Sequence, residues 1–230
     1  MNEEQDENLS RPSILDAVSM TQQSAALRTF NPQSLIEEYV EKLAPREKQI
    51  IIGRSGLADG MPLTLETIGR KMSLTRERVR QIEKDALKKL NRIAAPQGFK
   101  NGVDLLFQVI EENGKIMSTE KIFEEILTGN DSEVNRKGVL FMLHLVPQFN
   151  YFRETSDYRE AWFLPAFEQS VFQEILSLCQ QILTARARPL PKAELISELK
   201  NAETASPEIK NVSSEAIESY LSISKRIKKN

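Results

Sequence analysis

The strongest constraint on how this chain can fold comes from two threonines, eleven residues apart. Each threonine is followed by a run of apolar residues at helical spacing. Thr64 can cap a helix of about two turns whose inward residues are Leu65 and Ile68, and residues 72–74 follow as a turn. Thr75 can cap a second helix, whose apolar residues recur three and four positions apart: Val79, Ile82, Ala86, Leu87, Leu90 and Ile93. Because Pro96 ends this helix, the pattern predicts a helix-turn-helix with a long second helix.

The side of the second helix that faces away from its apolar stripe carries residues suited to the edges of DNA bases. These residues, which project together from the start of the helix, are Arg76, Glu77, Arg80, Gln81 and Lys84. Arginine can bind guanine O6 and N7, glutamine can pair with adenine, and glutamate can accept from the cytosine amino group. The alternative is a solvated face with ion pairs at helical spacing, which is the commoner state of a charged helix. The capped two-helix context favours DNA reading instead.

At these residues the sequence resembles a known family. Residues 43–93 resemble region four of the housekeeping (sigma-seventy type) bacterial sigma factors, the module that recognises the minus-thirty-five promoter element. The matching segments are Leu43–Glu47, Gly56–Leu57, Asp59–Gly60, Thr64–Gly69, Thr75–Glu83 and Ala86–Leu90. The resemblance covers about a fifth of the chain.

The resemblance also implies roles for individual residues. The residues expected to read bases are Arg76, Glu77, Arg80 and Gln81. The residues that we assign to phosphate contacts, through side chains or backbone N–H groups, are Thr64, Leu65, Arg70, Thr75, Arg78 and Lys84. The family also implies binding to the flap of the RNA polymerase β subunit. Asp85 departs from the family pattern, because a basic, DNA-contacting residue is common at that position, so we expect promoter affinity below the full strength of the family.

Charge is distributed unevenly along the 230 residues. Net charge is −3 for residues 1–31, +4 for residues 32–95 and −3 for residues 96–230. Residues 32–95 therefore form a basic segment in an otherwise acidic chain, and a local positive charge of this kind attracts phosphate. The sequence shows neither a signal peptide nor an apolar span, and its single cysteine cannot form an internal disulfide, so we expect a cytoplasmic protein, located at the bacterial nucleoid.

The pattern predicts a mainly α-helical chain in four parts. Residues 1–31 are expected to be a disordered acidic and polar tail, in which Ser13–Asp16 resembles a capping box. Residues 32–95 contain four predicted helices and include the helix-turn-helix. Residues 100–167 show three helical faces followed by two extended runs, 149–153 and 158–164, and therefore predict a winged helix. It resembles the HARE-type winged helix and the folded domain of the polymerase delta subunit.

A weak internal repeat relates residues 114–127 to residues 187–199. It predicts that residues 168–230 form a second, truncated winged-helix-like module. The apolar residues expected to pack this module are Phe172, Ile175, Leu176, Cys179, Ile182, Leu195, Ile196, Leu199, Ile217, Tyr220 and Leu221. The chain ends where a wing should begin, so this module is either shortened or completed by packing on its neighbour.

The sequence offers two kinds of partner for the two C-terminal modules, DNA and protein. Basic residues that could meet phosphates are Arg136 and Lys137 on the third helix of the winged helix, and Arg153 and Arg159 in the wing. Because the region is acidic overall, we favour contacts with other transcription proteins. Trp162 and Tyr151 are candidate aromatic anchors, although simple core packing is the preferred interpretation of Trp162.

Enzyme chemistry is not indicated. His144 and Cys179, each the single residue of its type, have no partners at metal-ligand or nucleophile spacing and are interpreted as packing or helix-surface residues. The nine glycines form no phosphate-binding loop. We therefore expect no catalytic residues, no metal and no cofactor.

These observations together predict a sequence-specific DNA-binding transcription factor of sigma type. It is expected to read a minus-thirty-five-like element in promoter DNA, to contact RNA polymerase and to act in transcription initiation or its regulation. The alternative is a polymerase-binding adaptor or decoy that docks on the β flap without reading sequence. We expect a monomer when the protein is free.

Overall fold

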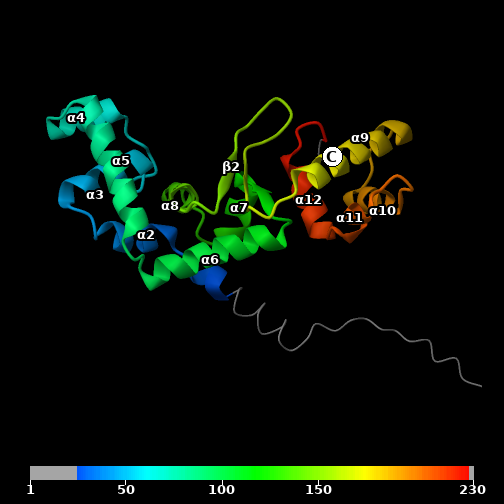
Figure 1. The fold of residues 1–230 in the computed structure, drawn as a ribbon, viewed down its shortest axis with the longest axis horizontal. Helices are drawn as coiled ribbons and strands as arrows, with labels where there is room; N and C mark the ends of the chain where they lie inside the picture. Colours follow the sequence, from blue (N-terminus) through cyan, green and yellow to red (C-terminus); the bar gives the residue numbers. More distant parts are fainter. Residues whose placement is uncertain (1–24, 228–230) are drawn as a thin grey trace, which may run out of the picture.

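The computed structural model describes residues 25–227, so the proposed capping box at residues 13–16 lies outside the described residues. The first part contains α2 (Pro32–Val40), α3 (Pro45–Ser55), α4 (Leu65–Met72) and α5 (Arg76–Arg92). The middle part contains α6 (Gln97–Glu112), β1 (Ile116–Ser118), α7 (Thr119–Ile126), α8 (Glu133–Leu145), β2 (Asn150–Phe152) and β3 (Ala161–Phe163). The last part contains α9 (Gln169–Arg186), α10 (Lys192–Asn201), α11 (Pro207–Asn211) and α12 (Ser214–Ile223) (Figure 1).

Both threonine caps predicted from the sequence are confirmed. The Thr64 hydroxyl accepts a hydrogen bond from the Thr67 backbone N–H at 3.1 Å, and the Thr75 hydroxyl accepts one from the Arg78 backbone N–H at 3.2 Å. Each bond satisfies an N–H group that has no partner within its own helix. The structure is mainly helical and contains the helix-turn-helix.

The turn between α4 and α5 depends on a close backbone approach. Ser73 caps α4 in the left-handed conformation, with φ of 54°, and the Leu74 N–H donates to the Gly69 carbonyl at 2.8 Å. This brings the Leu74 carbonyl oxygen so near that a Cβ atom at Gly69 would lie 2.6 Å from it. The obstacle is backbone, so a side chain at this position must force the turn open.

We therefore expect Gly69→Ala to destabilise the helix-turn-helix by about 1–3 kcal/mol, the usual cost of overpacking a tight contact. Urea unfolding followed by circular dichroism measures this cost. Gly53→Ala in α3 is the matched control, because a Cβ there would lie 3.4 Å from side chains only, and helix propensity favours alanine. Equal stability of the two variants would contradict the proposed role of the close approach.

The helices α6 to α8 and the strands follow the order of a winged helix. The three strands form one antiparallel sheet in the order β1-β3-β2, with Met117 opposite Trp162 and Tyr151 opposite the same tryptophan. The two extended runs predicted from the sequence are present but shorter, and β1 was not predicted. All three residues of β1 are buried, so it lacks the alternation of polar and apolar residues by which a half-exposed strand is recognised.

The sheet is covered on both faces. Met117 and Trp162 belong to the apolar core shared with α6, α7 and α8, whereas Ile116 and Ala161 belong to the core of the C-terminal module, residues 168–227. Alternate residues of a strand point to opposite faces, so β1 and β3 each contribute to both cores. Trp162 is 1% exposed, and the preferred interpretation of it as a core residue is confirmed.

The first core continues beyond the winged helix into residues 27–57. Ile36 and Val40 of α2 are fully buried in the cluster that contains Leu106 and Met142. Contacts of α2 are mainly with α6 and α8. The expected tail also ends earlier than predicted: residues 25–29 are helical and Phe30 is buried, because its ring packs against α6. A small separate apolar cluster, centred on Ile50, Ile68 and Val79, packs the outer end of the helix-turn-helix.

The last described residues of the C-terminal module lie against the loop between β2 and β3. Ser224 pairs with Tyr158 in an antiparallel bridge, and the Arg159 N–H donates to the Ile223 carbonyl at 2.8 Å. Within the module Cys179 is fully buried, and burial raises the pKa of its thiol to about 12, which agrees with a packing role.

Residues 25–227 also show two absences. No helix there combines the length and the apolar character needed to span a membrane. No group of three or more His, Cys, Asp and Glu side chains in that range is arranged to hold a metal ion.

Candidate nucleic-acid interface

The start of α5 lies at one end of the molecule, beside α4 and away from the winged helix (Figure 1). The four residues expected to read bases, here called the reading face, are all exposed: Arg76, Glu77, Arg80 and Gln81. The opposite side of α5 is buried, with Val79, Ala86 and Leu90 completely inaccessible to solvent. The reading face is therefore open to a double helix.

Helix geometry explains why these residues share a direction. At 3.6 residues per turn each position advances by about 100°, so Arg76, Arg80 and Gln81 lie within about 140° of one another. The buried residues of α5 centre on the other side. A side chain on an α-helix also leans toward the N-terminus, which tilts the reading face toward the free end of α5.

Two members of the reading face are paired with each other. The Arg80 guanidinium donates two hydrogen bonds to the Glu77 carboxylate, at 2.8 and 2.6 Å. The hydrogen bond from Arg80 lowers the pKa of Glu77, and the same contact raises the pKa of Arg80. More than half of each side chain is exposed to water, which weakens the attraction between them. The pair uses Nε and one N–H of the Arg80 guanidinium, so the other edge of the guanidinium still offers two donors.

The residues assigned to phosphate contacts lie on α4 and α5 and at the starts of these two helices. Thr64 and Leu65 lie at the N-terminus of α4, where helix N–H groups and the helix dipole favour an anion. Arg70 is exposed and only loosely paired with Glu66, at 3.7 Å. The Thr75 hydroxyl is used as a cap, so the threonine can offer phosphate its hydroxyl proton. Arg78 and Lys84 are both exposed.

Ion pairs leave this region with a cationic surplus. Residues 32–95, all of which the structure describes, contain thirteen basic and nine acidic side chains. Five of each are joined in the pairs Lys48–Glu41, Arg54–Glu83, Arg70–Glu66, Arg80–Glu77 and Lys89–Glu47. Eight basic and four acidic side chains remain outside these pairs. Five of these eight basic residues lie on α5, so the unpaired positive charge of the region is concentrated on this helix.

Two residues that were not predicted from the sequence extend the same basic surface. Lys88 and Arg92 follow Arg76, Arg80 and Lys84 at intervals of four, and all five are exposed. This spacing was readable from the sequence and forms a ladder along the whole of α5. Arg92 lies about 18 Å beyond Arg80 along the helix axis, so it is distant from any groove that the reading face enters.

A supporting residue was also missed. Arg54 of α3 donates to the Leu63 carbonyl at 2.6 Å and to the Glu83 carboxylate at 3.2 Å. These bonds tie α3 and the segment before α4 to α5. The Glu83 carboxylate therefore holds α3 against α5.

The start of α5 is exposed and rich in cations, and α4 and the tight turn hold it in place. This arrangement defines a helix-turn-helix DNA-binding domain. The model of the family "Sigma-70, region 4" matches residues 39–92. This segment is therefore a sigma region-four domain, as the sequence resemblance indicated.

Curated relatives agree with this assignment. The chain is 42% identical over 77 residues to RNA polymerase sigma factor sigB of Arabidopsis thaliana, a match covering 34% of this chain and 13% of that protein. It is 36% identical over 104 residues to RNA polymerase sigma factor SigA of Clostridium acetobutylicum, covering 45% and 27%. A third relative, the RNA polymerase sigma-B factor of Nostoc sp., is 49% identical over 57 residues, covering 25% and 17%. The chain thus spans about a quarter or less of the length of these relatives.

Proposed function

We propose that this protein is a sequence-specific transcription factor that reads a minus-thirty-five-like promoter element through its sigma region-four domain. Base contacts come from Arg76, Glu77, Arg80 and Gln81 at the start of α5. The single observation that carries the proposal is the solvent exposure of all four residues at the free end of the molecule. The protein acts in transcription initiation or its regulation.

RNA polymerase is the proposed protein partner. The relatives carry RNA polymerase in their names, and the shared segment is the sigma region-four domain. We assign the contact to the β flap and the location to the bacterial cytoplasm, at the nucleoid, with the free protein a monomer. Tyr151, which is 41% exposed, is the proposed anchor for other transcription proteins.

The proposed binding is moderate in strength. Arg70, Arg78 and Lys84 supply three cations for phosphate contacts. When three phosphates are neutralised, a plot of the logarithm of the binding constant against the logarithm of the salt concentration has a slope of about −3. Asp85, exposed beside Lys84, repels phosphate. Thr64, Leu65 and Thr75 add N–H and hydroxyl donors without adding charge.

A second candidate function is a polymerase-binding adaptor or decoy that occupies the flap without reading sequence. The closed Glu77–Arg80 pair and the exposed Asp85 favour it, because both reduce the readiness of α5 to bind DNA. Such an adaptor would bind DNA weakly and without preference.

Selection of duplexes from a random pool, followed by a salt series, distinguishes the two functions. The full chain is expected to enrich a common hexamer and to bind it at least tenfold more tightly than a random duplex, since two or three good base contacts each contribute about 1–3 kcal/mol. Immobilised RNA polymerase is expected to retain the protein without DNA. Retention with no enriched sequence would support the adaptor; enrichment without retention would indicate a DNA-binding regulator independent of polymerase.

A further inference from the structure

The reading face contains one acidic residue, Glu77, and the other three members all act on it. The hydrogen bond from the Arg80 guanidinium is the main cause of the lowered pKa of Glu77. A hydrogen bond from Gln81 and the positive charge of Arg76 lower the same pKa further. The Glu77 carboxylate is therefore ionised and tied to the residues that surround it.

The bonds between Glu77 and Arg80 occupy one edge of the guanidinium. Nε and Nη2 of Arg80 donate to the two carboxylate oxygens of Glu77, at 2.8 and 2.6 Å. A guanidinium carries five N–H groups in one plane, so Nη1 and the second N–H of Nη2 remain as a parallel pair of donors at the neighbouring edge. Guanine O6 and N7 accept from such a pair. The edge that a guanine needs is thus available while Glu77 holds Arg80.

The pair also reduces the attraction of Arg80 to phosphate. An arginine without a partner is drawn to phosphates, which lie along both grooves and carry no sequence information. The Glu77 carboxylate cancels the charge of Arg80 but leaves its directional donors. Arg80 is consequently better suited to a base edge than to a phosphate.

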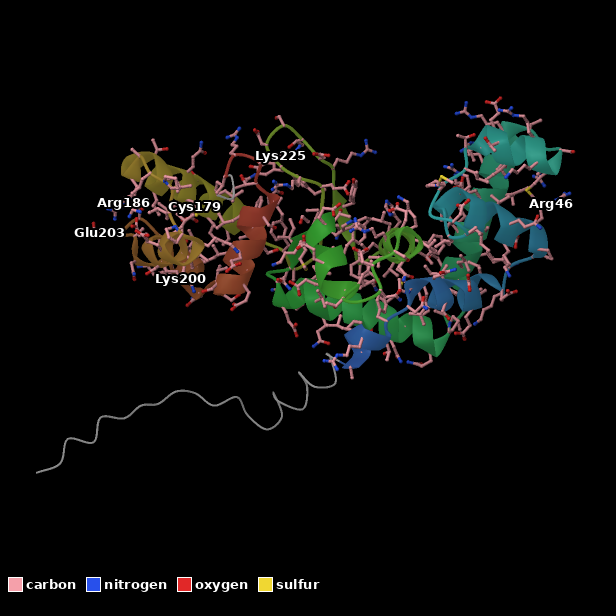
Figure 2. The ribbon with its side chains drawn as sticks, turned by 180° about the vertical axis from the view of Figure 1, so that it is seen from behind. Arg46, Cys179, Arg186, Lys200, Glu203 and Lys225 are labelled. Carbon is pink, nitrogen blue, oxygen red and sulfur yellow. The ribbon has the colours of Figure 1, made fainter. Side chains whose placement is uncertain are left out.

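Within residues 25–227, Glu77 is the acid with which Arg80 is paired. It is also the only acid there that raises the pKa of Arg80. Seen from behind in Figure 2, the α4–α5 end stands apart from the C-terminal module, and nitrogen-bearing side chains extend from it into open space. The orientation of Arg80 therefore depends on its neighbour one helical turn earlier.

We propose that Glu77, besides contacting a base, positions Arg80, so that the two side chains read DNA as one unit. This inference rests on the proposed function and deepens it. An unrestrained arginine gives up its side-chain rotamers when it binds a base, and this loss lowers affinity. Arg80 has already given up part of that freedom to Glu77, so less is lost when the duplex binds.

Discrimination at individual base pairs measures this positioning. The full chain is titrated by fluorescence anisotropy with the selected duplex and with duplexes in which one base pair at a time is substituted. Arg80→Ala identifies the base pair that Arg80 reads, because discrimination is lost there. Glu77→Ala is expected to reduce discrimination at that same base pair about three- to tenfold, in addition to the loss at the base pair that Glu77 contacts. Glu77→Gln keeps one acceptor oxygen and is expected to fall between the wild type and Glu77→Ala.

Glu66→Ala on α4 is the matched control. It also removes an exposed carboxylate beside an arginine, but its partner Arg70 is assigned to phosphate and not to a base. Either alanine variant removes one negative charge near the DNA, so both are expected to bind random duplexes slightly more tightly. Only Glu77→Ala is expected to change discrimination at the Arg80 base pair.

Unchanged discrimination at the Arg80 base pair in Glu77→Ala would overturn the positioning role. An equal loss of affinity for every duplex would overturn it too, because that result reflects folding or charge and not the orientation of one side chain. The inference also fails if Arg80→Ala changes discrimination at no base pair. Failure of the proposed function looks different, since the wild-type chain would then bind selected and random duplexes equally.

Discussion

Arg80→Ala is expected to lower affinity for the selected duplex by about 5- to 150-fold, corresponding to the 1–3 kcal/mol of a good bidentate base contact. Affinity for random duplexes is expected to fall much less. The reason is that Arg80 projects from the exposed reading face and has no packing role in residues 25–227 beyond its pair with Glu77. Anisotropy titrations with selected and random duplexes at one salt concentration measure both quantities.

Arg92→Ala provides the control for this measurement. It removes the same charge from the same helix, at an exposed position about 18 Å farther along the axis. Its effect on the preference between selected and random duplexes is expected to be negligible. If both variants reduce affinity equally on every sequence, α5 attracts phosphate through its positive charge but does not read bases. The adaptor is then the better explanation of the function of this domain.

Ile36→Ala is expected to destabilise the protein by about 2–5 kcal/mol, the usual cost of removing a fully buried isoleucine side chain. Ile36 is completely inaccessible and packs in the core that α2 shares with α6 and α8. Trp162, the only tryptophan, lies in the same core, on strand β3, which is far from α2 in the sequence. Thermal unfolding followed by its fluorescence is therefore expected to shift downward by about 5–15 °C.

The exposed Glu38→Ala on the same helix is the control and is expected to leave the Trp162 transition unchanged. The contrary result would be an Ile36→Ala variant whose Trp162 fluorescence changes at the same temperature as in the wild type, while its helical signal is lost at a lower temperature. That outcome would mean that the region-four domain and the winged helix unfold separately, in spite of their shared core.

Local chemistry made the helix-turn-helix readable from the sequence. Thr64 and Thr75 mark helix starts by the hydrogen bonds that their hydroxyls accept, and spacings of three and four mark the buried side of α5. Both features depend only on residues within one or two turns. The exposure of Arg76, Glu77, Arg80 and Gln81 follows from the same pattern, while their contacts with bases stay a prediction.

Contacts between distant segments were not readable in the same way. The pairing of Glu77 with Arg80 selects one side-chain rotamer among several, which spacing alone does not decide. The strand β1 has only three residues, all buried, and exists because β3 offers it hydrogen bonds. The Ser224–Tyr158 bridge joins residues far apart in the chain.

By itself, the sequence determined which residues of each helix face inward, where the helices of the region-four domain begin, and which side chains at the start of α5 face water. Only the tertiary structure decided that α2 lies on α6 and α8, that the sheet is covered on both faces, and that residues 223–225 lie against the loop between β2 and β3. The physical reason is that periodicity records the presence of an apolar side but not the partner that covers it. That partner is selected by shape and by hydrogen bonds formed once the chain has folded.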